Sequence, residues 1–151
     1  MSEWTTDLDI RVKLAVYRGA AERGVLPRAE EVASDVSATV QDVRDSYARL
    51  AQRRLLVLEP DGLTIRMAPP FSGVPTDHLV RSGGIAYFAN CAWDALGIPV
   101  ALHRPADVES RCGQSGTPLL LEVGLNGPAP SSWLFHCSVP AAQWWRDIVY
   151  T

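Results

Sequence analysis

Two residues of complementary chemistry, Cys91 and Asp94, stand three positions apart in the apolar run CAWDAL at 91–96. In a helix this spacing places both side chains on one face, within reach of each other or of a shared ligand. A carboxylate is costly to bury among apolar side chains, so its pKa should rise and it could hold or pass a proton. A thiol binds soft metals. The pair predicts metal capture coupled to proton delivery, although Cys91 could also be a packed core residue and Asp94 a turn cap.

The other residues with metal-binding chemistry show weaker patterns. His78, His103 and His136 do not have the spacing of a metal site and are interpreted as ordinary surface or loop histidines. His136 is adjacent to Cys137, and adjacent strand residues face opposite ways. The tryptophan pair at 144–145 is expected to serve packing.

Composition indicates a soluble globular protein. The 151 residues are 47% hydrophobic and 21% charged, enough for one ordinary domain or two small ones. No apolar run is long enough to span a membrane, and the N-terminus has no signal-peptide pattern. Three cysteines are an odd number and fit a compartment that keeps thiols reduced, so a cytoplasmic location is expected. The sequence is compatible with either a monomer or a homodimer.

The N-terminal elements that surround this chemistry predict a winged helix-turn-helix in a domain at 1–68. Helices are expected at 5–24, at 27 to about 35 and at 38–53, with Ser37 as the N-cap of the third, followed by a hairpin of 55–58 and 63–66. The domain holds ten basic and eleven acidic residues, a formal charge of −1. Phosphate binding needs a local basic surplus, so nucleic acid is not expected as a partner and a structural role is favoured over DNA binding.

The second half predicts a small mixed α/β domain at 77–151, joined by a proline-rich linker at 69–76. An apolar helix is expected at 85–96, ended by Gly97 and Pro99. Strands are expected at 108–111, 119–123 and 133–137, and a last helix after Pro140. The whole chain therefore predicts an α+β fold in which the central helix carries Cys91 and Asp94.

The run YFANCAWDALGIP at 87–99 resembles the catalytic helix of the organomercurial lyase (alkylmercury lyase) family. The segments VESRC at 108–112 and SGTPL at 115–119 are similar to the strand, turn and strand that follow it in the family. SVPAA at 138–142 is similar to the start of a later family helix. A winged-helix-like N-terminal part is also a family feature.

The resemblance implies roles for individual residues. Cys91 matches the cysteine that attacks mercury, and Asp94 matches the acid that takes the thiol proton and protonates the departing carbon. Cys112 matches a cysteine with a structural role. The family's second mercury-binding cysteine falls near Ser131 or Ser132, and Cys137 could replace it only if the strand register differs. Strand alternation therefore favours the hypothesis that Cys137 is not the second ligand and that activity depends on added thiol.

The expected function is protonolysis of a carbon–mercury bond, R–Hg⁺ becoming RH and Hg²⁺, in mercuric resistance and detoxification. Mercury is substrate and product, so no cofactor is expected. The partners would be an organomercurial or a soft metal ion together with small thiols as co-reactants. The alternative is a non-catalytic thiol-based metal or ligand binder or sensor, including a winged-helix regulator.

Overall fold

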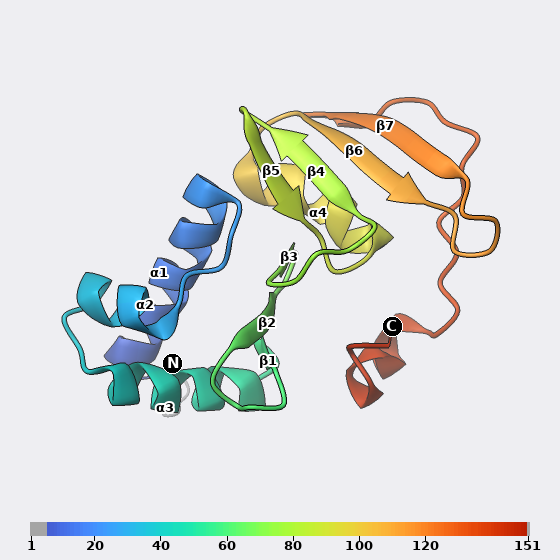
Figure 1. Ribbon diagram of the computed structural model, residues 1–151. Coiled ribbons are helices and arrows are strands. Elements are labelled where there is room, and N and C mark those ends of the chain that lie inside the picture. Colours follow the sequence, from blue (N-terminus) through green and yellow to red (C-terminus); the bar gives the residue numbers. More distant parts are fainter. Residues whose placement is uncertain (1–5, 151) are drawn as a thin grey trace.

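The computed structural model describes residues 6–150 and contains two sheets, five principal helical segments and a long C-terminal segment (Figure 1). The first half contains α1 (Asp7–Arg23), α2 (Ala29–Asp35), α3 (Val40–Gln52), β1 (Val57–Leu58), β2 (Ile65–Ala68) and β3 (Phe71–Ser72). The second contains β4 (Leu79–Ser82), β5 (Ile85–Phe88), α4 (Ala92–Leu102), β6 (Ala106–Arg111), β7 (Pro118–Gly124), β8 (Gly127–Pro128) and the 3₁₀ helix η1 (Ala141–Arg146). The expected α+β class is confirmed. Within residues 6–150, no helix has the length and apolar character needed to cross a membrane.

Local capping sets the ends of the first helix. Thr6 and Asp9 form a capping box, in which each side chain accepts a hydrogen bond from the other residue's backbone N–H. Gly24 ends the helix in the left-handed conformation, with φ of 75°. The expected helix at 5–24 is therefore present at nearly these bounds, except that residue 5 and the N-terminal residues before it lie outside the described part of the chain.

Helix α3 begins later than its sequence predicts. Thr39, not Ser37, is the N-cap, and its hydroxyl oxygen accepts a hydrogen bond from the Asp42 N–H at 3.1 Å. Ser37 has a φ of 51° and lies in the turn that leads into the helix. Thr39 is the N-cap because Asp42 is its N3 residue and completes the reciprocal capping box.

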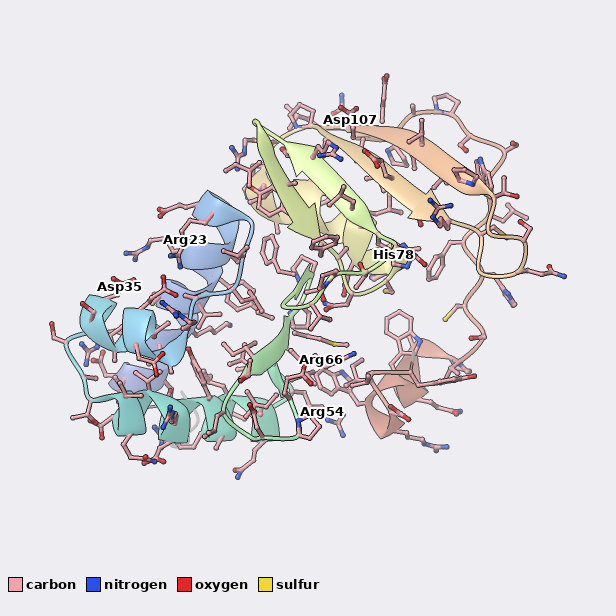
Figure 2. The ribbon with its side chains drawn as sticks, in the orientation of Figure 1. Arg23, Asp35, Arg54, Arg66, His78 and Asp107 are labelled. Atoms are coloured by element: carbon pink, nitrogen blue, oxygen red, sulfur yellow. The ribbon has the colours of Figure 1, made fainter. Side chains whose placement is uncertain are left out.

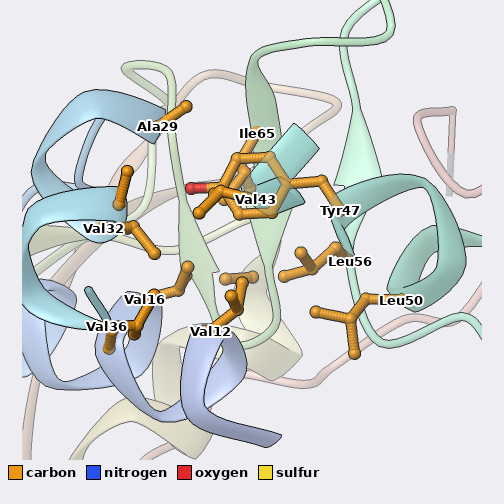
Figure 3. Packing of buried hydrophobic residues seen from close by; sticks show 13 residues of the cluster. Val12, Val16, Ala29, Val32, Val36, Val43, Tyr47, Leu50, Leu56 and Ile65 are labelled. Atoms are coloured by element: carbon orange, nitrogen blue, oxygen red, sulfur yellow. The ribbon is translucent and has the colours of Figure 1, made fainter. Parts of the chain in front are cut away.

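Valine, leucine and tyrosine side chains from all three N-terminal helices form the first core (Figure 3). Val12 and Val16 of α1, Val32 of α2 and Val43 of α3 are fully buried there. The antiparallel strands β1, β2 and β3 continue from this core, with β2 in the middle of the sheet. The hairpin expected at 55–66 is thus present, with a third short strand added to it.

A buried carboxylate joins α1 to α3. Asp9 is 1% exposed, and its Oδ1 accepts hydrogen bonds from the Ser46 hydroxyl at 2.6 Å and from Arg49 Nη2 at 2.7 Å. Burial alone would raise the pKa of Asp9, but the hydrogen bonds from Arg49, Ser46 and the Thr6 N–H outweigh it and lower this pKa to about 2. The first core therefore contains a fully paired anion that ties two helices together.

The segment at 69–76, expected as a linker, contains a buried strand. Phe71 and Ser72 form β3, which pairs with β2, and the Phe71 ring contacts Tyr17 and Tyr87 at centroid distances of 6.3 and 5.7 Å. Phe71 is 5% exposed and belongs to the second hydrophobic core. The proline-rich sequence therefore forms part of the packing between the two halves.

The five-stranded antiparallel sheet has the order β5-β4-β6-β7-β8, and α4 packs against β4, β6 and β7. The helix expected at 85–96 is wrong in its first half. Residues 85–88 form β5, which pairs with β4 through a two-residue turn in which Gly83 and Gly84 have φ of 59° and 80°. Two positive φ values are the signature of a tight hairpin turn, and glycine adopts them without strain.

Helix α4 also runs further than predicted. Gly97 and Pro99 were expected to end it, yet both lie within the helix, which ends at Leu102 with His103 as a left-handed cap. Pro99 lacks an N–H to donate to Ala95, but the helix continues because Ala95 and Ile98 are fully buried in the second core.

Side chains and backbone of α1 contact the second sheet directly. The Tyr87 hydroxyl of β5 donates a 2.7 Å hydrogen bond to the Ala21 carbonyl oxygen of α1. A Cβ atom on Gly24 would collide with the Ala86 carbonyl oxygen, so the end of α1 approaches β5 as closely as a backbone can. Tyr17 and Leu26 pack against both hydrophobic cores.

We expect Tyr87→Phe to lower the free energy of unfolding by about 1–2 kcal/mol, because it leaves the Ala21 carbonyl without this buried donor. Chemical denaturation of the two proteins measures the difference. Tyr150→Phe is the matched control, since Tyr150 is 80% exposed and should change little. Equal stability of Tyr87→Phe and the wild type would contradict the role assigned to this hydrogen bond.

Candidate functional site

Cys91 lies at the first turn of α4 and not in the middle of a helix. It is the N-cap residue, with extended backbone, so its side chain lies beside the free N–H groups of the first helical turn. The Ala95 N–H donates to the Cys91 carbonyl at 2.9 Å and closes the first helical hydrogen bond. The three-residue spacing from Asp94 therefore joins an N-cap to an N3 residue.

A cavity of about 980 Å³ surrounds the Cys91 side chain. One side is formed by α4 and the inner face of β6 and β7, including Leu96, Val108 and Leu121. The other side is formed by the C-terminal segment, including Phe135 and Trp144. All three cysteines of the chain line this cavity: Cys91, Cys112 and Cys137.

The Cys91 thiol is half-buried and favours its protonated form. Burial raises the pKa of this thiol, and the negative charge of Asp94 raises it further. The nearby backbone N–H groups of Asp94 and Trp93 act in the opposite direction and lower this pKa. A metal that binds in place of the thiol proton would offset the cost of ionising this half-buried sulfur, because metal binding stabilises the thiolate.

Asp94 lies beside Cys91 but is not among the residues that line the cavity. Its Oδ2 accepts a 2.8 Å hydrogen bond from the Asn90 side-chain amide, and its charge contributes to raising the pKa of Tyr17 on α1. Burial raises the pKa of Asp94, while the Asn90 amide partly offsets this. Cys91 therefore lines the cavity and Asp94 does not, although the charge of Asp94 contributes to the raised pKa of the thiol.

The expected strand at 133–137 is absent. Residues 131–139 have no regular secondary structure, and residues 131–138 are exposed. Strand alternation therefore does not apply here, and it gives no argument against Cys137. Cys137 lines the same cavity as Cys91, and its sulfur donates a 2.7 Å hydrogen bond to the Val139 carbonyl.

Contacts along its length hold the C-terminal segment over the site. The Ala129 N–H donates to the Glu122 carbonyl at 2.8 Å, and the Phe135 ring lies 5.7 Å from the Trp93 ring. Further on, the Arg54 guanidinium lies 5.8 Å from the Trp145 ring centroid, and Figure 2 shows Arg54 beside the C-terminal helical turn. The helix expected after Pro140 is present as η1. These contacts explain how a segment without a strand still places Cys137 at the cavity.

Cys112 is the cysteine to which the resemblance assigns a structural role. It is half-buried, follows β6 directly and lines the cavity. The Ser115 hydroxyl, followed by the backbone N–H groups of Ser115 and Gln114, holds the pKa of the Cys112 thiol below its usual value. Hydrogen bonds from a tight turn thus make this thiol easier to ionise than an ordinary cysteine.

Sequence reasoning missed His78. This histidine was expected to be an ordinary loop residue, but it is half-buried and lines the cavity, and its Nδ1 lies 2.7 Å from the Ser110 hydroxyl oxygen. The signal lay in β6, where Ala106, Val108 and Ser110 are the buried alternating positions. A serine at the third inward position needs a polar partner. His136 also lines the cavity, from the exposed segment, and His103 caps α4.

Within the described residues, no group of three or more His, Cys, Asp or Glu side chains is arranged to hold a metal ion. The three cysteines share a cavity without forming a preassembled metal centre.

The alkylmercury lyase family model, MerB, matches residues 71–151, which is more than half of the chain. The chain belongs to the alkylmercury lyase family. The match begins at β3 and includes α4, the five-stranded sheet and all three cysteines. The residues that the family model matches therefore include all of those that line the cavity.

A solved structure supports the fold over a longer stretch. The crystal structure of the mercury-bound form of MerB2 matches with a TM-score of 0.66 and 24% sequence identity. The match covers 87% of this chain and 62% of that one, so this chain spans less than two thirds of the length of that relative. At this identity the likeness shows the fold. No curated protein matches the chain.

Proposed function

We propose that this family member cleaves carbon–mercury bonds by protonolysis, with Cys91 as the residue that binds mercury. The observation that carries the proposal is the half-buried Cys91 thiol at the N-terminus of α4, in a cavity with two further thiols. The apolar walls fit the organic group of an organomercurial, and the sulfurs fit the metal. The solved MerB2 structure is a mercury-bound form, which agrees with a mercury substrate for this chain.

The steps follow from the protonation states of the two residues. The Cys91 thiol loses its proton as its sulfur bonds mercury, and Asp94 takes that proton, because burial raises its pKa and favours the protonated carboxyl group. A second sulfur then adds to mercury and increases the electron density on the departing carbon. Asp94 returns the proton to that carbon, the carbon–mercury bond breaks, and RH leaves while mercury stays bound to two sulfurs.

We propose Cys137 as the second sulfur. The gapless match places the family cysteine near Ser131 or Ser132, and a serine hydroxyl is too hard to bind mercury well. Cys137 lies six residues beyond Ser131, and both line the cavity. Cys91 and Cys137 line the same cavity, and Cys137 is among the groups that raise the pKa of the Cys91 thiol. Small thiols then serve to remove the product metal.

The test is release of benzene from phenylmercury by the wild-type protein in excess small thiol. We expect release catalysed above the thiol-only background, and we expect Cys137→Ser to lower kcat by at least about tenfold, because mercury then lacks its second protein sulfur. Cys112→Ser is the matched control and should retain most of the activity.

Two outcomes would count against this assignment. No release above background by the wild type would contradict the lyase function. A larger loss in Cys112→Ser than in Cys137→Ser would assign the second sulfur to Cys112 instead, whose pKa is lowered and which lines the same cavity.

A non-catalytic thiol-based binder or sensor is the second candidate. It is favoured by the position of Asp94 outside the cavity lining and by serines where the family cysteine is expected. Such a protein would bind phenylmercury in proportion to Cys91 without releasing benzene. Binding followed by tryptophan fluorescence, beside the hydrocarbon assay, separates the two.

We further propose that residues 1–68 form a winged-helix-like domain that docks on the domain at 77–151. Three helices followed by antiparallel strands support the first part, and the Tyr87–Ala21 hydrogen bond supports the second. The formal charge of −1 over 1–68 does not provide the basic surface that DNA binding needs. In this proposal the N-terminal domain supports the site and does not read nucleic acid.

A further inference from the structure

The proposed function leaves one proton without an acceptor. In R–Hg–X + 2 R′S–H → R–H + Hg(SR′)₂ + H⁺ + X⁻, two thiols each lose a proton. One of these protons forms the new carbon–hydrogen bond. The other must leave the second sulfur for a base, because X departs as an anion. Asp94 can carry only one proton at a time, so the site needs a second acceptor on the cavity side.

His78 is the half-buried imidazole on that side. Its ring is fixed by the 2.7 Å contact between Nδ1 and the Ser110 hydroxyl oxygen, and Ser110 is 7% exposed. Its backbone is held as well, since the His78 N–H donates to Thr76 Oγ1 at 3.2 Å and its carbonyl accepts from the Ala89 N–H at 2.9 Å. His78 directly precedes β4 (Figure 2). The side chain is therefore a fixed part of the cavity wall.

The charge state of His78 suits an acceptor. Burial lowers the pKa of His78, while the charge of Asp77 raises it in part, and the net shift leaves a neutral ring at pH 7. The other titratable or charged side chains that line the cavity, among the described residues, are Asp77, Cys91, Arg111, Cys112, His136 and Cys137. Of the two imidazoles, His136 is exposed and has no described hydrogen-bond partner, whereas His78 is oriented by a buried hydroxyl.

We propose that His78, held by Ser110, accepts the proton that the second thiol loses when mercury binds. The inference rests on the proposed function, and it adds a proton acceptor to it. The S–H bond of the second thiol breaks, its electron pair forms the sulfur–mercury bond, and the proton passes to the free ring nitrogen of His78, directly or through water. Ser110 is a positioning residue, because it acts through the imidazole.

The test uses mercury(II) chloride and the full chain, and it does not require turnover. Stopped-flow quenching of tryptophan fluorescence measures the rate of mercury binding between pH 5 and 8. In the wild type we expect this rate to fall as pH drops through a pKa below 6.5, where the imidazole becomes protonated. In His78→Gln we expect that limb to disappear and the rate at pH 7 to fall at least about tenfold, with partial rescue by added imidazole.

Two further variants keep the outcome interpretable. Ser110→Ala should retain a pH-dependent limb with a shifted midpoint, because the imidazole stays but loses its partner. His103→Asn, at the far end of α4, should match the wild type. An unchanged pH profile in His78→Gln, or an equal loss in His103→Asn, would overturn the proposal. Absence of benzene release by a wild type that still shows the His78-dependent limb would contradict the lyase function and leave this inference standing.

Discussion

Cys91→Ser is expected to abolish benzene release from phenylmercury, with a loss of at least about a thousandfold in kcat/KM. The sulfur is the soft ligand that binds mercury at the N-terminus of α4, and a hydroxyl at the same N-cap position binds it poorly. Serine is nearly the same size and is itself a good N-cap, so α4 should still form. The loss of activity would therefore result from replacing the sulfur atom by oxygen and not from loss of the helix. Gas chromatography of the released benzene measures it directly.

The comparison with Asp94→Asn shows whether metal binding and proton transfer are separate. That variant keeps the Cys91 thiol and should still bind phenylmercury, but it cannot carry the proton, so we expect binding with little release. Circular dichroism and the melting temperature serve as controls for folding. Activity of Cys91→Ser within tenfold of the wild type would remove Cys91 from the mechanism.

The second large effect concerns stability. Asp9→Ala is expected to lower the free energy of unfolding by about 3 kcal/mol, the lower end of the cost of breaking a buried ion pair, because Arg49 is 38% exposed and can reach water. The change removes the acceptor for Ser46 and Arg49 and half of the capping box with Thr6. Urea denaturation measures this difference. Asp7→Ala is the matched control on the same helix, since its ion pair with Arg11 is exposed and should contribute little.

The stabilisation by Asp9 should also depend on pH in one direction. The pKa of Asp9 is lowered to about 2 in the folded protein, from an ordinary value of 3.8. A group with a lowered pKa stabilises the fold above its unfolded-state pKa, and the effect is lost as pH falls toward the folded-state pKa. The stability gap between wild type and Asp9→Ala should thus be full at pH 5 and shrink between about pH 4 and 2. A gap that does not change with pH would show that the charge of Asp9 is not responsible.

Regular periodicity predicted the N-terminal half well. The apolar positions of 5–24 and 38–53 recur at helical spacing, and α1 and α3 follow them closely. The choice between Ser37 and Thr39 as N-cap depends on which residue has an acidic N3 partner, and the sequence contains that information at Asp42. The family resemblance identified the region of the site from the run at 87–99, which lies within the family match.

The second half was harder because packing overrides local pattern there. Residues 85–88 are as apolar as a helix requires, but the pair Gly83-Gly84 turns them back along β4. That turn moves the start of α4 to Ala92 and makes Cys91 a cap. The segment at 131–139 has apolar and aromatic residues that can occur in a strand, yet no neighbouring strand pairs with it in the described structure. Long-range pairing of this kind cannot be read from local spacing.

His78 illustrates a contact that depends on sheet register. It precedes β4, whereas Ser110 lies 32 residues away on β6, and the two meet because Leu79 pairs with Glu109. Neither residue has a sequence neighbour that suggests the contact. Only the order β4-β6 in the sheet brings the imidazole to the serine and to the cavity of Cys91.

Tyr17 and Leu26 pack against both hydrophobic cores, and this sharing has a thermodynamic consequence. Neither core can lose its order without exposing apolar side chains of the other, so the two halves should melt in one cooperative transition. A destabilising substitution far from the cysteines, at Asp9 for example, would then also lower the temperature at which the mercury-binding cavity unfolds. The thermal stability of the site therefore depends on the packing of helix α1.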